Sequence, residues 1–364
     1  MTIYTKRARS GGQRRRPGLL AIGAALAAVL VGGCASGPRT GGEEALRRPT
    51  ASTDADAFAA RQSDLELVET GPDGESLSLR FTDLGPLDAP VVVFVHGVPT
   101  SSWMYRKAID PVAREGVRVV APDNVGWGTS SKPEMPDDVA RRFYTPQRQA
   151  ERLGRLLTAL EIGRAVFVVH DVGGPIVWEL LADRPELAAG VLVLNTIGAP
   201  GGFAPPAAVD SVSVQADMRA AGFERDATIR SIVCGMVGDP DEIDTPEQLE
   251  GYYRPFQDGS GLPYYAFLTS LDAIRDRVPS YEQTIGELSC PASIIWGAGD
   301  ENLLAEPSVP WFADALSVPA RRRIVLEDAK HLVAEEAPDR IARQALELVR
   351  LATEDGDESE GAAR

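Results

Sequence analysis

The sequence predicts an α/β domain built around a mainly parallel β-sheet that is flanked by helices. Short β-rich runs alternate with helical stretches between about residues 63 and 352, which is the order expected of strands joined by crossover helices. Several runs, such as Val91–Val95, are uniformly apolar, as strands buried on both faces should be. One run, Ala165–Val169, leads directly into a tight Gly-rich turn and a helical stretch.

The expected elements can be placed in chain order. Eight segments read as strands: Leu65–Glu69, Leu77–Thr82, Val91–His96, Val117–Ala121, Ala165–His170, Val191–Asn195, Ala292–Trp296 and Arg323–Leu326. Three segments read as helices: Thr145–Leu160, Pro175–Asp183 and Pro338–Ala352. The last of these opens with a proline, which suits the first turn of a helix.

One interval interrupts this alternation. Between Leu194 and Cys290 we find no clear strand of the parallel type, and the segment is rich in aromatic residues and proline. A structureless loop of this length would be uncommon. We therefore expect residues 196–289 to form a largely helical cap, inserted after the sixth strand, between two parts of one core, residues 63–195 and 290–352.

The amino terminus has the features of an export signal. Residues 1–33 hold six basic and no acidic residues, and a 13-residue apolar run, Leu19–Val31, leads to Val31-Gly32-Gly33-Cys34. A basic start, a short apolar run and small residues describe a signal peptide, and the final Cys resembles a bacterial lipobox. We expect Cys34 to become a lipidated amino terminus that anchors an exported protein to the outer face of a membrane. The alternative is an uncleaved transmembrane anchor, although spanning requires about 20 apolar residues.

Charge and composition limit the partners of the folded part. The net charge is −16, which argues against nucleic acid or anionic lipid as the main partner. Without residues 1–33 the chain has 53 acidic and 31 basic residues, a net charge of −22. Residues 34–62 read as a flexible linker and residues 353–364 as an acidic disordered tail. Cys234 and Cys290 are interpreted as two buried thiols, with pairing left open.

The segment Val168-Val169-His170-Asp171-Val172-Gly173-Gly174-Pro175 carries most of the functional information. A strand, a sharp turn and a helix form a nucleophile elbow, which lifts one side chain clear of a parallel sheet. The raised residue is Asp171, where Ser is usual. Asp300 and His331 follow the next two strands, so that nucleophile, acid and base occur in the order Asp171, Asp300, His331. We expect these three residues to form a catalytic triad.

A second turn is expected to complete the site. His96-Gly97-Val98-Pro99 follows the strand Val91–Val95. A backbone N–H at Val98 could join the N–H of Val172 in holding a developing oxyanion. The alternative is a Gly/Pro turn with a packed histidine. His96, Pro99 and His170 are therefore expected to line the site.

These motifs resemble the haloalkane dehalogenase and epoxide hydrolase branch of the α/β-hydrolase superfamily. The resemblance spans about residues 63–352, is weakest in the cap, and rests on His96-Gly97-Val98-Pro99-Thr100-Ser101-Ser102-Trp103, Ala121-Pro122-Asp123-Asn124-Val125-Gly126-Trp127-Gly128, His170-Asp171-Val172-Gly173-Gly174, Gly297-Ala298-Gly299-Asp300 and Lys330-His331. It implies an α/β-hydrolase fold and an Asp nucleophile. Because a carboxylate is already ionised at neutral pH, it can attack an sp³ carbon and form an alkyl-enzyme ester. Water activated by His331 and Asp300 would then hydrolyse this ester.

The resemblance leaves the leaving group open. Haloalkane dehalogenases carry Trp after the nucleophile and often Asn in the His-Gly-X-Pro turn. Here those positions are Val172 and Val98, whose side chains have no donor. Epoxide hydrolases use cap tyrosines to protonate the alkoxide. The expected function is thus epoxide hydrolase-like, with haloalkane dehalogenase, using a donor such as Trp103 or a cap residue, as the alternative. The candidate cap tyrosines are Tyr252, Tyr253, Tyr264, Tyr265 and Tyr281.

Two further functions agree less well with the sequence. A non-catalytic lipoprotein that keeps the fold is disfavoured by the complete set Asp171, Asp300 and His331. A carboxylesterase would need a Ser in the elbow. The three histidines all occupy motif positions, so no metal-ligand cluster is expected, and no dinucleotide fingerprint follows the first strand. The expected partners are a small hydrophobic electrophilic substrate and water, without a cofactor; the oligomeric state is left open.

Overall fold

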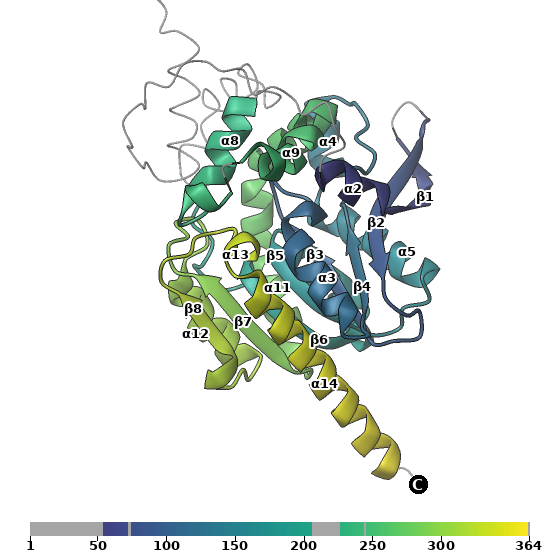
Figure 1. Ribbon diagram of the computed structural model, residues 1–364, viewed down its shortest axis with the longest axis vertical. Coiled ribbons are helices and arrows are strands. Elements are labelled where there is room, and N and C mark those ends of the chain that lie inside the picture. Colours follow the sequence, from purple (N-terminus) through teal and green to yellow (C-terminus); the bar gives the residue numbers. More distant parts are fainter. Residues whose placement is uncertain (1–53, 72–73, 206–225, 244, 363–364) are drawn as a thin grey trace, which may run out of the picture.

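An eight-stranded, mostly parallel sheet forms the centre of the molecule (Figure 1). This computed structural model describes residues 54–71, 74–205, 226–243 and 245–362. The strand order is β1-β2-β4-β3-β5-β6-β7-β8. The β1–β2 and β2–β4 pairs are antiparallel, and all other pairs are parallel. The expected α/β class and mainly parallel sheet are therefore confirmed.

All eight expected strands are present. Their bounds are β1 Ser63–Thr70, β2 Ser76–Leu84, β3 Val91–Val95, β4 Arg118–Pro122, β5 Ala165–Asp171, β6 Ala188–Thr196, β7 Ala292–Gly297 and β8 Arg323–Leu326. Every residue of β4, β5, β6 and β7 is buried. Burial on both faces explains why these strands are apolar along most of their length instead of alternating.

Helices cover both faces of the sheet. In Figure 1, α3 (Arg106–Arg114) and α14 (Pro338–Ala362) lie in front of the strands, whereas α5 (Pro146–Ala159) lies behind them. The helix α6 (Gly173–Asp183) packs against α5. The remaining helices of the core are α4 Asp137–Phe143, α12 Ala305–Ala315 and α13 Val333–Glu336. The expected helices correspond to α5, α6 and the first part of α14.

The insertion between β6 and β7 is helical in the part that the structure describes. Its helices are α8 Asp226–Gly235, α9 Pro246–Pro255, α10 Gly261–Leu268 and α11 Leu271–Glu287. Strand-type pairing in these residues is limited to one isolated bridge between Phe203 and Leu303. In Figure 1, α8 and α9 lie above the sheet together with α4. The expectation of a helical cap after the sixth strand agrees with this arrangement.

The expected linker over residues 34–62 requires correction at its end. Residues Asp54–Ala60 form a short helix, α2, with Ala55 and Phe58 buried. The Phe58 ring meets the Trp103 ring edge-on, with 5.4 Å between centroids. Because two apolar side chains find a packing surface here, this segment belongs to the folded body. The expected signal peptide, residues 1–33, and Cys34 lie outside the described residues.

The expected disordered tail also differs from the structure. The helix α14 continues through residues 353–362. Its buried face ends at Ala352, and Arg350 forms an i,i+4 ion pair with Glu354. Such a pair supports the helix just beyond its packed part. Among the described residues, no helix combines the length and apolar character needed to cross a membrane.

Candidate active site

The nucleophile elbow is formed at the end of β5. Asp171 has a φ of 50°, a left-handed backbone conformation that is strained for a residue with a Cβ and that is found most often at functional sites. The helix α6 begins two residues later, at Gly173. A sharp turn between a buried strand and a helix therefore projects the Asp171 side chain beyond the sheet edge.

Two glycines allow the close approach that this turn requires. A Cβ on Gly97 would lie 2.4 Å from the Cβ of Asp171 and 2.6 Å from its Oδ2. A Cβ on Gly173 would lie 2.3 Å from the carbonyl oxygen of Val95. Both distances are far below any normal contact, so the turns after β3 and β5 fit together only with glycine at these positions.

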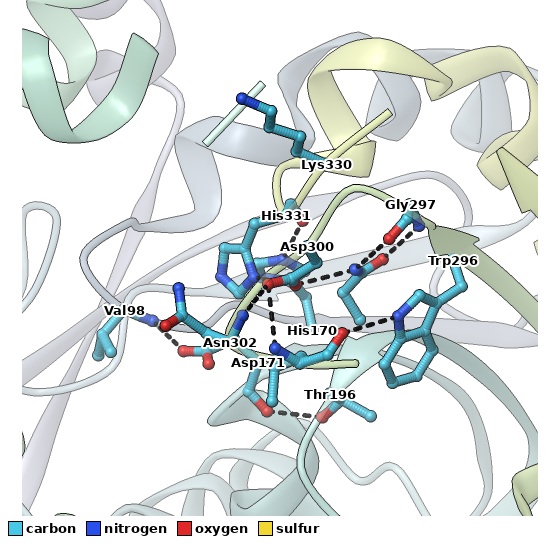
Figure 2. A network of polar contacts seen from close by, with 12 residues as sticks. Val98, His170, Asp171, Thr196, Trp296, Gly297, Asp300, Asn302, Lys330 and His331 are labelled. Atoms are coloured by element: carbon cyan, nitrogen blue, oxygen red, sulfur yellow. Dashed lines mark hydrogen bonds and ion pairs between the residues drawn. The ribbon is translucent and has the colours of Figure 1, made fainter. Parts of the chain in front are cut away.

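Backbone groups surround the Asp171 carboxylate. The N–H of Val98 donates to Oδ2 at 2.9 Å (Figure 2), and the Thr196 hydroxyl donates to the Asp171 carbonyl at 2.5 Å. Burial raises the pKa of Asp171, while the positive charge of His331 and the N–H groups of Val98 and Val172 act to lower it. The two expected oxyanion donors, Val98 and Val172, thus both act on this carboxylate.

His331 and Asp300 form a buried hydrogen-bonded pair. Nδ1 of His331 lies 2.7 Å from Oδ2 of Asp300. Burial alone would lower the pKa of His331, but the charges of Asp300 and Asp171 and the hydrogen bond to Asp300 raise it. Burial would raise the pKa of Asp300, but His331 and several hydrogen bonds hold it below its ordinary value. The imidazole is therefore a stronger base than a free histidine.

The Asp300 carboxylate is held by donors on both oxygens. The backbone N–H groups of Asn302 and Leu303 each donate to Oδ1 at 3.0 Å. The amide of Asn195 donates to Oδ2 at 2.9 Å. Asn195 was not predicted as a site residue. Its only sequence signal is its place at the end of an apolar strand, and its role becomes visible through the pairing of β6 with its neighbours.

That pairing shifts register beside the elbow. His170 is opposite Leu194, but Asp171 is opposite Thr196, so Asn195 is passed over. A residue left out of the ladder in this way can turn its side chain to a new partner. Here the Asn195 side chain bridges to β7, because Gly297 donates to its Oδ1 at 2.8 Å. The bulge therefore connects the elbow with the strand that precedes Asp300.

His96 and His170 are packed between backbone groups. The N–H of Asn124 donates to Nε2 of His96 at 3.0 Å, so Nδ1 carries the proton and donates to the Gly97 carbonyl at 2.8 Å. His170 donates from Nε2 to the carbonyl of His331 at 2.8 Å. Burial lowers the pKa of both rings. They are neutral supports of the turns, in agreement with the packed-histidine alternative for His96.

A small cavity of about 60 Å³ lies over Asp171 and His331. Tyr264 and Asn302 are the other lining residues with polar side chains. Burial and the charge of Asp171 raise the pKa of Tyr264, which stays protonated. Apolar residues complete the wall: Val98, Pro99, Phe203, Pro205, Met236, Phe267, Leu268, Leu271 and Leu303. Of the residues proposed from the sequence to line the site, Val98, Pro99 and Tyr264 line this cavity.

The other cap tyrosines lie elsewhere. Tyr252 donates to Oε1 of Glu335 at 2.5 Å, away from the cavity. Tyr253 is buried and Tyr265 half-buried, and neither lines the cavity of Asp171. Tyr281 lines a larger neighbouring cavity. The predictions that Tyr252, Tyr253 and Tyr265 line the site are corrected: Tyr252 on α9 is directed to Glu335 of the core helix α13, and the rings of Tyr253 and Tyr265 are absent from the wall of this cavity.

Trp103 also requires correction as a site-lining residue. Its indole N–H donates to the carbonyl of Gln248 at 3.1 Å, and the Arg106 guanidinium lies 4.4 Å from its ring centroid. The ring therefore joins the core to the cap helix α9, and its donor is used there. Across the described ranges, no group of three or more His, Cys, Asp or Glu side chains is placed to hold a metal ion.

A sheet of this topology with an Asp, an Asp and a His at its carboxyl edge is the architecture of an α/β-fold hydrolase. Comparison with known proteins agrees, because residues 92–344 match the Alpha/beta hydrolase family. The chain belongs to that family. Its curated relatives include haloalkane dehalogenases and epoxide hydrolases.

Individual relatives cover only part of the chain. A haloalkane dehalogenase from Mycolicibacterium paratuberculosis is 33% identical over 150 residues, 41% of this chain and 45% of the relative. Epoxide hydrolase A from Mycobacterium tuberculosis is 34% identical over 134 residues, 37% of this chain and 40% of the relative. The chain thus spans less than half the length of these curated relatives.

Solved structures are similar over most of the fold. Haloalkane dehalogenase DbeA from Bradyrhizobium elkani has a TM-score of 0.67 at 22% identity, with 81% of this chain and 99% of that chain covered. Haloalkane dehalogenase DpaA from Paraglaciecola agarilytica has a TM-score of 0.64 at 25% identity, with 81% and 97% covered. At such identities the similarity shows the fold.

Proposed function

We propose that this hydrolase acts through an Asp171 ester, and that its substrates are epoxides. The observation that carries the choice is the side-chain chemistry of the 60 Å³ cavity. Tyr264 lines this cavity together with Asp171 and His331, and its raised pKa keeps the phenol protonated, whereas Val98 and Val172 offer no side-chain donor to a halide. An oxygen that leaves as an alkoxide needs a proton, and a buried phenol can supply it.

The first step is attack by the carboxylate on an sp³ carbon. Oδ2 of Asp171 accepts from the Val98 N–H, so Oδ1 is the oxygen that attacks. A new C–O bond forms at the epoxide carbon, the epoxide C–O bond breaks, and the released alkoxide takes the Tyr264 proton. The product is a hydroxyalkyl ester of Asp171.

The second step is hydrolysis of that ester. Neutral His331 accepts a proton from water, and the resulting hydroxide adds to the carbonyl carbon of the ester. The oxyanion forms on Oδ2, which already faces the N–H of Val98. Asp300 stabilises the imidazolium through its 2.7 Å contact with Nδ1. On collapse the bond between Cγ and Oδ1 breaks, and the departing alkoxide takes the proton of the added hydroxyl, so that the diol and the Asp171 carboxylate result. The proton on His331 then returns to the Tyr264 phenolate through the product or solvent.

The test is a trapping experiment. The variant His331→Gln should react with styrene oxide but hydrolyse the ester slowly, so intact-protein mass spectrometry should find one added substrate mass on Asp171. The wild type should release the diol, and Asp171→Ala should do neither. If the wild type releases no diol from a broad epoxide panel and the His331 variant gains no mass, the proposal fails.

One observation favours a second candidate, a haloalkane dehalogenase. The side-chain amide of Asn302 lines the cavity beside Asp171, and an amide N–H can bind a departing halide. Several relatives bear that activity in their names. Halide release from brominated alkanes that Asn302→Leu abolishes, with no diol formed from epoxides, would replace the first proposal by this one.

We also propose that the protein is an exported lipoprotein with Cys34 as its lipidated amino terminus. The support is the order of a basic segment, the apolar run Leu19–Val31 and small residues before Cys34. The full chain expressed in a bacterium should enter the detergent phase on extraction and gain the mass of a diacylglyceryl group. The variant Cys34→Ala should remain in the aqueous phase; if it partitions as the wild type does, lipidation is refuted.

A further inference from the structure

A second, larger cavity adjoins the one that holds Asp171. Its volume is about 550 Å³, against about 60 Å³ for the reactive cavity. The side chains of Val98 and Phe267 line both, so the two spaces share a wall directly beside the carboxylate. A space of this size falls within the range of pockets for extended organic ligands.

The inner wall of the large cavity is apolar. Next to the elbow it is formed by Val98, Val172, Ile176, Ala266 and Phe267, four of which are less than 8% exposed. Such a wall favours a hydrocarbon chain, because burial of each CH₂ group contributes about 0.8 kcal/mol. The cavity lies between the core helices α4, α5 and α6 and the cap helices α10 and α11, which supply its remaining lining.

The outer part carries more positive than negative charge. Its charged lining residues are Arg141, Arg142, Arg277 and Asp272, although the chain as a whole has a net charge of −16. Three of them are paired: Arg142 with Asp138, Arg277 with Glu179, and Asp272 with Arg275. Arg141 is exposed and forms no ion pair with another residue in the described ranges. Its guanidinium is therefore available to a ligand at the exposed end of the cavity.

We propose that the large cavity binds the body of an amphipathic anionic substrate. The substrate has the electrophilic carbon at one end, an apolar chain along the inner wall, and a carboxylate or similar anionic group that meets Arg141 at the mouth. This inference rests on the proposed function, because Asp171 is taken as the nucleophile for the electrophilic end. It adds a substrate class that the reactive cavity alone does not define.

The test compares two substrates that differ in charge alone. These are 10,11-epoxyundecanoate and 10,11-epoxyundecan-1-ol, or the corresponding 11-bromo compounds if halide is released instead. At low ionic strength the wild type should have a higher kcat/KM for the carboxylate. Arg141→Glu should lower kcat/KM for the carboxylate about five-fold, mainly through KM, as expected for one exposed ion pair. The same variant should change the value for the alcohol by less than about two-fold.

A matched control is Arg114→Glu, which makes the same charge change at an exposed position outside both cavities. It should leave both substrates unaffected, and added salt should reduce the effect of Arg141→Glu. A second variant, Ala273→Trp, fills the mouth and should slow the eleven-carbon substrates while sparing propylene oxide. Equal effects of Arg141→Glu on carboxylate and alcohol, with normal wild-type turnover, would overturn this inference and leave the proposed function intact. Absence of turnover of every substrate would overturn both.

Discussion

The side-chain amide of Asn195 donates to the same oxygen of Asp300 that pairs with His331. Nδ2 of Asn195 lies 2.9 Å from Oδ2 of Asp300, and Nδ1 of His331 lies 2.7 Å from that atom. The bulge at the end of β6 frees Asn195 for this contact. The orientation of Asp300, which follows β7, therefore depends on the neighbouring strand β6. The elbow depends on the same strand, because Thr196 of β6 donates to the Asp171 carbonyl.

Replacement of Asn195 by Leu should reduce activity more than stability. The side chain keeps its approximate volume, but Asp300 loses a donor and the Gly297 N–H loses its acceptor, which costs about 1–3 kcal/mol of unfolding free energy. We expect kcat for epoxide hydrolysis to fall at least about ten-fold at a temperature where the variant is folded. Ser293→Ala, which removes a buried hydroxyl without a hydrogen-bond partner on β7, should leave both quantities unchanged. Equal losses in the two variants would contradict the role assigned to Asn195.

Tyr264→Phe should separate protonation of the leaving group from packing. The ring stays in place, but the cavity loses its phenolic donor. Ester formation from styrene oxide in the His331→Gln background should slow about 100-fold, as expected for loss of a general acid. Tyr265→Phe changes the neighbouring ring, which does not line that cavity, and should react at the parent rate. A Tyr264→Phe variant that forms the adduct at the parent rate would show that another group protonates the oxygen.

The pH dependence of hydrolysis should have an acid limb set by His331. The charges of Asp300 and Asp171 raise the pKa of this imidazole above its ordinary value of 6.5, and only the neutral ring can accept a proton from water. Activity should therefore rise with pH through a pKa above 6.5. Asp300→Asn removes one of the charges that raise the pKa, so the residual activity of this variant should have its limb at lower pH. If the acid limb of the pH profile stays at the same pH in Asp300→Asn, the limb belongs to a group other than His331.

Glu335 should stabilise the protein at neutral but not at acidic pH. Its carboxylate is 4% exposed and contacts Lys107 at 2.9 Å, Arg106 at 3.0 Å and Tyr252 at 2.5 Å. Burial would raise the pKa of Glu335, but Arg106 and Lys107 hold it below the ordinary value of 4.5. A lowered carboxyl pKa contributes stability above the unfolded-state value that is lost as pH falls through the folded-state value.

The variant Glu335→Gln should consequently be destabilised by about 3 kcal/mol at neutral pH, because it leaves Arg106 buried without its charge partner. Denaturant unfolding at about pH 7 and about pH 3.5 should show a smaller difference between variant and wild type at the lower pH. Glu347→Gln, at a partly exposed position on α14, is the control for a general charge effect. A difference that is the same at both pH values would refute the linkage.

Phe58→Ala should destabilise the folded body although it lies before the first strand. Phe58 is 8% exposed and packs on Trp103, and truncation of a buried Phe costs about 3 kcal/mol. Leu87→Ala, at a side chain that is 74% exposed, should change unfolding free energy by less than about 0.5 kcal/mol. If Phe58→Ala is equally neutral, α2 contributes nothing to the stability of the core.

The sequence predicted those features that depend on local pattern. The strands buried on both faces appear as continuous apolar runs, so all eight could be located within a few residues. Asp171, Asp300 and His331 could be selected because each follows a predicted strand in a polar turn. The structure brings these three residues together at one edge of the sheet.

The features that could not be predicted depend on packing across long sequence separations. Asn195 reaches Asp300 over 105 residues through a register shift. Only one of the adjacent tyrosines of α10, Tyr264, lines the cavity of Asp171, and its direction follows from how α10 packs on the core. The helix α2 has seven residues and two buried side chains. Two apolar positions are too few to show the hydrophobic periodicity of a helix within a polar segment.

The burial of His96 and His170 has a practical consequence. Both rings have each nitrogen either bonded to main chain or sealed from solvent, and the chain has three histidines in all. An acylating reagent for imidazoles would therefore encounter a single responsive ring, His331. The amount of label bound at this ring, measured as moles of label per mole of chain, would give the number of intact active sites in a preparation before any substrate has been found.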